Sequence, residues 1–371
     1  MVRDSRPEKP RSPSRARQAR WAVPAGAVLV AGGVLAGSLI SGGAAQAAPV
    51  LPSRTPAQLL AAVAQSTGPA LSGTVTETAS LGLPALPGNS SSPTSITSLL
   101  TGSHTVKVAY ASPQHYRISL PAPMSETDLI RDGSTAYLWQ STQNTVTEYT
   151  APASKSQQAP AATPALTPQQ AAQQALAAVG PTTTVSVDSN VMVAGQAAYE
   201  LVLAPKDTRS LVGQIRIAID GSNGVPLRVQ VFARNAASPA ISVGFTSVTF
   251  ATPPSSQTSF TPPAGAKIIK ASAGQHKPAT GAKPDVSTTG TGWLTVLSAP
   301  TPTLTGTKNA GQNESGAVLH DLLAAATSVH GAWGSGKLLH TSLVSVLMTD
   351  SGRTYIGAVQ PSVLYAAAAQ H

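Results

Sequence analysis

The feature that most constrains this chain is a set of four alternating apolar segments between Ala197 and Phe250. They cover residues 197–204, 213–220, 226–233 and 241–248. In the first of them Tyr199, Leu201 and Leu203 alternate with smaller or polar residues, and the others repeat that pattern. A period of two residues is typical of strands that bury one face. Short polar turns separate the segments, so we predict an antiparallel meander whose apolar face must be covered.

Similar alternation extends the prediction towards the N-terminus. Further strands are expected at 71–79, 104–110, 116–120, 126–130, 135–140, 144–149 and 184–194. Two helices are predicted at 55–66 and 167–179, each opened by a capping Thr followed by Pro. Between them lies an aliphatic-rich loop, 81–102, of the kind that serves as a lid or binding segment. The whole gives roughly ten or eleven strands and two helices.

The N-terminal segment, residues 1–47, resembles a secretion signal. Its first twenty residues hold seven Arg or Lys against Asp4 and Glu8, and an apolar stretch, 21–40, precedes the sequence Ala45-Gln-Ala47. Small residues in this A-x-A arrangement favour cleavage after Ala47, whereas the length of 21–40 also suits a retained membrane anchor. Either reading predicts that the remainder lies outside the cytoplasm.

Composition separates the rest of the chain into parts and excludes several functions. Residues 48–250 are predicted to form one domain of antiparallel strands, 251–292 a linker rich in Pro, Gly, Ala and Lys, and 293–371 a small α+β module. That module is predicted to contain strands at 293–297, 338–348 and 354–359 and helices at 315–325 and 361–369. The net charge of +9 comes mostly from the N-terminal segment, so nucleic-acid binding is not expected. The chain has no cysteine, which excludes disulfides and thiolate metal sites.

Two sequences carry a family resemblance: AYELVLAPKD at 198–207 and GQIRIAIDGSNGVPLRVQVFA at 213–233. They resemble the LolA-like superfamily, which includes the outer-membrane lipoprotein carriers and the RseB/MucB regulators. The resemblance implies an incomplete antiparallel barrel of about eleven strands, plugged by helices, whose concave side holds acyl chains. The tail at 333–368 is similar to the C-terminal module of RseB-like members, and to tails common in high-GC, actinobacteria-like organisms. The long linker and the extra tail depart from the carriers.

The candidate lipid-binding residues are large apolar side chains of the strands and of the 81–102 loop. They are Leu81, Leu83, Val108, Tyr110, Tyr116, Ile118, Tyr137, Trp139, Tyr199, Leu201, Ile215, Ile217, Leu227 and Val229. The helix at 167–179 offers mainly Ala side chains to fill the space above them, which favours a cavity. Ordinary core packing is the alternative.

No pattern indicates catalysis, a metal site or a cofactor. The seven histidines are scattered, and Glu126, Asp128 and Asp132 fit an exposed polar strand face. The motif G-x-x-x-x-G-K at 331–337 is followed by Leu338, where a phosphate loop needs Ser or Thr. No G-x-S-x-G nucleophile elbow occurs.

The sequence therefore predicts an exported, non-enzymatic protein that holds acyl chains of a lipid or lipoprotein. The alternative is an RseB/MucB-like regulator that binds a membrane anti-sigma factor or another envelope protein, as the tail suggests. A third reading is an envelope scaffold with a fully packed core.

Overall fold

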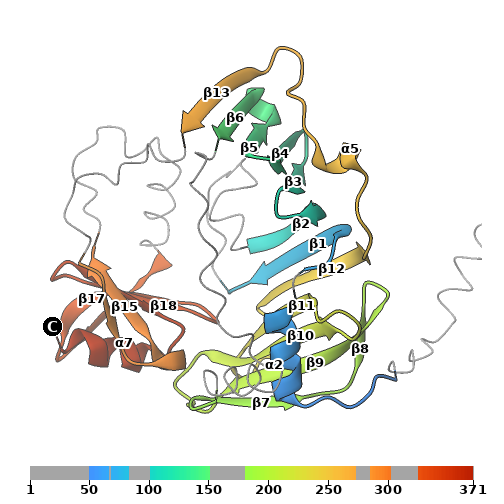
Figure 1. The fold of residues 1–371 in the computed structure, drawn as a ribbon. Coiled ribbons are helices and arrows are strands. Elements are labelled where there is room, and N and C mark those ends of the chain that lie inside the picture. Colours follow the sequence, from blue (N-terminus) through green and yellow to red (C-terminus); the bar gives the residue numbers. More distant parts are fainter. Residues whose placement is uncertain are drawn as a thin grey trace, which may run out of the picture. The chain divides into compact units, whose positions relative to one another are not determined.

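The computed structural model describes residues 50–66, 68–82, 101–150, 180–272, 285–301 and 325–370 (Figure 1). The predicted signal segment, the predicted helix at 167–179 and most of the loop at 81–102 lie outside these residues. No helix in the described ranges is long and apolar enough to cross a membrane.

Most of the described chain forms one large mixed sheet of 13 strands with few helices. Its order is β13-β6-β5-β4-β3-β2-β1-β12-β11-β10-β9-β7, with β8 paired to β9. The strands are β1 (Leu71–Ser80), β2 (Thr101–Ser112), β3 (His115–Ala122), β4 (Ser125–Asp132), β5 (Thr135–Gln140), β6 (Thr145–Thr150), β7 (Thr183–Val187), β8 (Val191–Val193), β9 (Gln196–Pro205), β10 (Val212–Asp220), β11 (Pro226–Ala233), β12 (Ile241–Thr249) and β13 (Lys267–Ser272).

Two meanders make up this sheet, and the predicted turns lie between their strands. β2 to β6 follow one another as hairpins, and β9 to β12 do the same. The turn at Asp132-Gly133 has Gly133 at a φ of +61°, a conformation that glycine adopts without strain. The meanders meet where β1 pairs with β12, about 170 residues later in the chain.

Two features of the sheet differ from the sequence-based prediction. It has 13 strands where about eleven were expected, and it is not purely antiparallel because β13 runs parallel to β6. β13 and the short helix α5 (Ser255–Thr258) lie within 251–292, the stretch predicted to be a linker. Residues 251–272 are therefore structured and contribute an edge strand.

The helix predicted at 55–66 is present as α2 (Pro56–Gln65). Its capping box is complete: the Thr55 side chain accepts from the Gln58 amide, and the Gln58 side chain accepts from the Thr55 amide. The helix places Leu59 in a buried cluster with Tyr199, Leu201, Leu203 and Ile219 of the large sheet. One face of the second meander is thus covered by the helix that precedes β1.

The C-terminal residues form a second sheet of six strands, in the order β14-β15-β19-β18-β17-β16. Its elements are β14 (Ser287–Thr289), β15 (Val296–Pro300), β16 (Thr327–Gly331), β17 (Gly334–His340), β18 (Ser345–Thr349), β19 (Arg353–Gly357) and α7 (Pro361–Ala368). The predicted strand at 338–348 is interrupted at 341–344, where Thr341 bonds back to Val344. The motif at 331–337 belongs to the β16–β17 hairpin rather than to a phosphate loop. Most of the helix predicted at 315–325 lies outside the described residues.

Candidate functional site

A row of apolar side chains crosses the first meander from strand to strand. Val108 pairs with Ile118, Ile118 with Leu129, and Leu129 with Leu138. The row continues through Thr147 of β6 to Ile269 of β13. In-register partners project from the same face of a sheet, so these side chains form one surface. We call Val108, Ile118, Leu129, Leu138 and Ile269 the apolar row.

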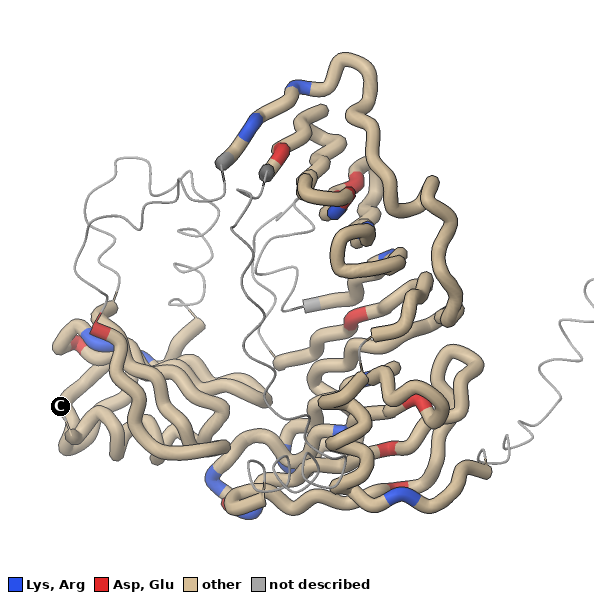
Figure 2. The backbone as a smooth tube through the Cα atoms, in the orientation of Figure 1, with Lys and Arg blue, Asp and Glu red and all other residues tan. Residues whose placement is uncertain are grey.

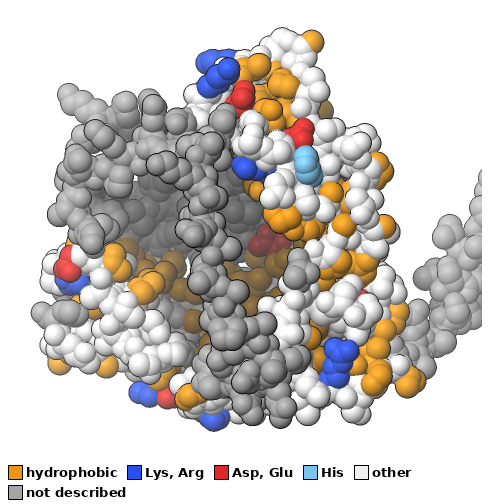
Figure 3. Space-filling model, viewed as in Figure 1, with side chains coloured by type: hydrophobic (Ala, Val, Ile, Leu, Met, Phe, Trp, Pro, Cys, Tyr) orange, Lys and Arg blue, Asp and Glu red, His pale blue; other side chains and the backbone are white. Residues whose placement is uncertain are grey.

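The apolar row is only partly covered. Ile118, Leu129 and Ile269 are 38%, 40% and 41% exposed. A parallel row on the same face includes Tyr149, which is also exposed, and the stacked pair Tyr110 and Tyr116, with ring centroids 6.5 Å apart. Hydrophobic side chains reach the surface between polar ones in the space-filling view (Figure 3). Large apolar groups left exposed together across several strands indicate a surface for an apolar partner or ligand.

Tyr137 and Trp139 lie on the opposite face from this row, contrary to the prediction that groups them with it. Trp139 is in register with buried Asp128, and Tyr137 with buried Ile130. Phe260, from the segment after α5, packs on Tyr137 with ring centroids 5.2 Å apart. These two aromatic residues therefore belong to the face that the α5 segment covers.

The predicted residues of the second meander lie in cores that the chain itself fills. Tyr199 and Leu201 are buried under α2, and the Tyr199 hydroxyl donates to the Pro52 carbonyl over 2.6 Å. Ile217 packs against that cluster, and Ile215 contacts it as well as the cluster that contains Leu81. These side chains contribute to stability rather than to an open surface.

Three further predicted residues complete the comparison. Leu227 is the unpaired residue of an irregularity between β10 and β11, and it packs with Ala198 and Ala218 rather than with the Tyr199 cluster. Val229 pairs with Ile217, as the alternation predicts. Leu83 lies outside the described residues. The predicted set is thus divided among several clusters, and the apolar row brings together Val108 and Ile118, with Tyr110 and Tyr116 beside it.

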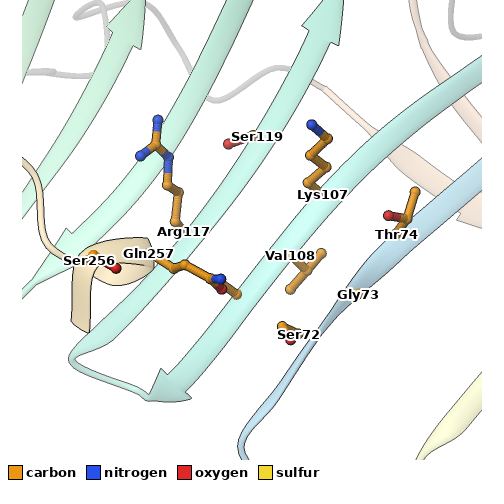
Figure 4. A pocket seen from close by; sticks show the side chains of 10 residues that line it. Ser72, Gly73, Thr74, Lys107, Val108, Arg117, Ser119, Ser256 and Gln257 are labelled. Atoms are coloured by element: carbon orange, nitrogen blue, oxygen red, sulfur yellow. The ribbon is translucent and has the colours of Figure 1, made fainter. Parts of the chain in front are cut away.

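A pocket of about 400 Å³ lies on the face covered by α5 (Figure 4). Its lining is mostly polar: Ser72, Gly73, Thr74, Lys107, Val108, Ala109, Arg117, Ser119, Ser256 and Gln257. Of the predicted site residues only Val108 is among them. The alternation of β2 and β3 places Lys107 and Arg117 on a polar strand face. Nothing in the sequence distinguishes them, as pocket residues, from other polar residues of that face. The contribution of Gln257 depends on α5, which lies inside the stretch predicted as a linker.

Charged residues are sparse along the described backbone (Figure 2), and several of them form ion pairs. Glu200 of β9 is buried and accepts from Arg216 of the neighbouring β10 and from Arg228 of β11, one strand further on. On the surface, hydrogen bonds from Arg209 lower the pKa of Asp207 to about 2, so this carboxyl stays ionised. No group of three or more His, Asp or Glu that could hold a metal ion occurs in the described part of the chain.

No protein-family model and no curated protein matches the sequence. Among solved structures, the MucA/MucB complex of Pseudomonas aeruginosa matches with a TM-score of 0.42 and 13% identity, over 84% of this chain and 96% of that one. MucB in complex with MucA(peri) matches at 0.41 and 12%, with the same coverage. A LolA superfamily protein from Nitrosomonas europaea matches at 0.21 and 10%, over 56% of this chain and 99% of that one.

The matching structures thus include MucB and LolA-superfamily proteins, the groups that the sequence resembles. Their identities are below 25% and their TM-scores below 0.5. No ligand, partner or site residue is therefore carried over from them to this chain.

Proposed function

We propose that this chain is a non-enzymatic, extracytoplasmic protein of the cell envelope that binds acyl chains of a lipid or lipoprotein on the apolar row. The observation that carries the proposal is the in-register arrangement of Ile118, Leu129 and Ile269, each about two-fifths exposed. The row crosses neighbouring strands as an apolar track that only Thr147 interrupts, which suits an extended hydrocarbon better than a compact polar molecule.

The magnitudes support reversible binding. Completing the burial of a side chain that is two-fifths exposed contributes about 0.6–1.2 kcal/mol, and each of ~14 methylenes of an acyl chain adds ~0.8 kcal/mol. The ligand's share is therefore about 11 kcal/mol before the roughly 4–15 kcal/mol needed to immobilise it. The net free energy of binding is the small difference between this gain and this cost. Binding of that strength fits a carrier or a sensor that must release its cargo.

The test compares two adjacent isoleucines of β13. We expect Ile269→Asn to weaken palmitate binding roughly five- to hundredfold, because it removes part of the apolar row and buries an amide against hydrocarbon. Ile268→Asn is the matched control: Ile268 is 51% exposed but points to the other face of the same strand. Displacement of a fluorescent fatty acid measures the affinities, and native mass spectrometry identifies lipid that copurifies from the host.

Equal losses in the two variants, or no palmitate binding by the unaltered chain, would refute the proposal. Adding Leu129→Asn to Ile269→Asn extends the test to the centre of the row. The double variant is expected to bind more weakly still, while its melting temperature stays close to that of the parent because both side chains are partly exposed.

A second candidate, a regulator that binds a membrane anti-sigma factor, is favoured by one feature of the C-terminal sheet. Leu297 of β15 and Ile356 of β19 are cross-strand partners that are 45% and 40% exposed. Their neighbours along both strands, Val296 and Tyr355, point the other way into the cluster that α7 covers. Two large apolar side chains on the face away from the helix suit a protein partner.

This candidate predicts that Leu297→Asn combined with Ile356→Asn abolishes binding to the extracytoplasmic domain of an anti-sigma factor from the same organism. Biolayer interferometry with the full chain would measure it, and Ile269→Asn serves as the comparison variant. If palmitate binding survives in the double variant while the protein partner is lost, both functions stand. If neither variant changes partner binding, the C-terminal surface is not the contact.

A further inference from the structure

The pocket under α5 is built from two in-register rows across β1, β2 and β3 and from two residues of α5. Thr74, Lys107 and Ser119 form one row, and Ser72, Ala109 and Arg117 form the other. All six side chains therefore project from one face. Ser256 and Gln257 of α5 complete the site, and Gln257 extends over the strands from the helix (Figure 4).

The pocket carries one positive charge without a partner. The Arg117 guanidinium donates to Asp128 through Nη2, so these two charges offset each other. Lys107 is exposed and makes no hydrogen bond or ion pair with any residue of the described ranges. Its ammonium group therefore leaves the pocket with a net charge of one positive unit.

Two buried polar atoms beside this lysine are also unsatisfied. Arg117 Nε and Asp128 Oδ1 have no hydrogen-bond partner among the described residues, and Asp128 is fully buried. Leaving such a group unpaired costs about 1–3 kcal/mol. Arg117 lines the pocket, so a molecule there that supplies an acceptor would relieve Arg117 Nε, whereas Asp128 is not part of the lining and has no exposed surface.

We propose that this pocket binds a small phosphate ester. The phosphate oxygens would accept from Lys107, from Arg117 Nε and from the Ser and Thr hydroxyls, which are the usual donors to phosphate. The volume of about 400 Å³ lies at the small end of ligand sites.

This site is independent of the proposed acyl-chain surface. Lys107 and Arg117 alternate with Val108 and Ile118 on the same strands, so their side chains project from the face opposite the apolar row. Val108 is the one residue of the row that also lines the pocket. One short molecule cannot fill both. The phosphate ester is either a free metabolite or the exposed headgroup of a membrane lipid, and the chemistry of recognition is the same for both.

The probe is sn-glycerol 3-phosphate, titrated into the full chain and followed by isothermal titration calorimetry and by ³¹P line broadening. We expect binding that Lys107→Gln weakens at least tenfold, because the variant removes the unpaired charge and no folded-state contact. Lys270→Gln is the matched control, an exposed lysine on edge strand β13. Glycerol without phosphate should not bind.

The outcomes separate the alternatives. Loss of phosphatidylglycerol vesicle binding in Lys107→Gln identifies a lipid headgroup as the source, and unchanged vesicle binding identifies a free ester. Absence of ³¹P broadening at millimolar ligand, or equal weakening by Lys107→Gln and Lys270→Gln, overturns the proposal. Ile269→Asn should leave glycerol phosphate binding intact, so failure of the acyl-chain function and failure of this site are distinguishable.

Discussion

Replacing Glu200 by alanine is expected to destabilise the fold by about 2–4 kcal/mol. Glu200 is buried in the middle of β9, and its two carboxylate oxygens accept from Arg216 at 2.6 Å and from Arg228 at 3.0 Å. Removing the carboxylate leaves the mostly buried Arg228 guanidinium without its ion-pair partner and leaves Arg216 with only the exposed Asp188. Breaking a fully buried pair typically costs about 3–5 kcal/mol, and we reduce this figure because both arginines keep some solvent contact.

Urea unfolding monitored by tryptophan fluorescence measures this loss, provided that the slope with denaturant is unchanged. The matched control is Asp188→Ala. Asp188 also binds Arg216, over 3.1 Å, but its side chain is nearly half exposed. An exposed pair of this kind contributes about 0–1 kcal/mol. If both variants lost the same free energy of unfolding, the burial of Glu200 would not explain its contribution to stability.

Leu59→Ala is expected to destabilise the protein by about 2–5 kcal/mol. Leu59 has no exposed surface and fills the space between α2 and the side chains of Tyr199, Leu201 and Ile219. Truncating a buried leucine removes transfer free energy and leaves a cavity that rigid strands cannot close. The helix has only ten residues, so tertiary packing rather than helix propensity holds it in place.

Leu60→Ala is the control, since it makes the same change at the next position of the same helix. Leu60 is only partly buried against the cluster, so its loss should be about half as large or less. Thermal unfolding followed by circular dichroism compares the two variants. Similar melting temperatures for both would contradict the assignment of Leu59 as the anchor of α2.

The strands could be predicted from the sequence because each one carries its own local signal. Tyr199, Leu201 and Leu203 alternate with small or polar neighbours, and the flanking turns contain Pro, Asp or Gly. The helix at Thr55 could be predicted for a similar reason, since its cap, its first-turn Pro and its apolar stripe lie within ten residues. Because these sequence patterns span only a few residues, they can be recognised without knowledge of the rest of the fold.

Which face an aromatic pair occupies could not be predicted in the same way. Alternation shows that Tyr137 and Trp139 share a face and that Leu138 opposes them, but not which face is covered. That depends on the register of four hairpins and on Phe260, which lies more than a hundred residues away in sequence. The direction of the Leu227 side chain could not be predicted, because no feature of the sequence indicates the irregular pairing that reverses it.

β13 and the phosphate-ester pocket were missed for a related reason. The stretch Lys267-Ile-Ile-Lys270 is short, has a charge at each end and follows a Pro-rich segment, so its composition indicates a linker. Its pairing with β6 is parallel and long-range, so no hairpin turn in the sequence indicates it. The pocket depends on α5 from the same stretch, so one misassigned segment concealed both features.

The pairing of β13 with β6 sets an order of events during synthesis. β6 begins at Thr145 and its partner begins at Lys267, about 120 residues later. At roughly 5–20 residues per second the ribosome takes on the order of 6–24 s to cover this distance. Throughout that interval β6 presents unpaired amides and carbonyls to any neighbouring nascent chain. In a chain that is exported, as proposed, the same order holds while the chain emerges across the membrane, and a chaperone that shields this strand until its partner emerges would therefore raise the yield of folded protein.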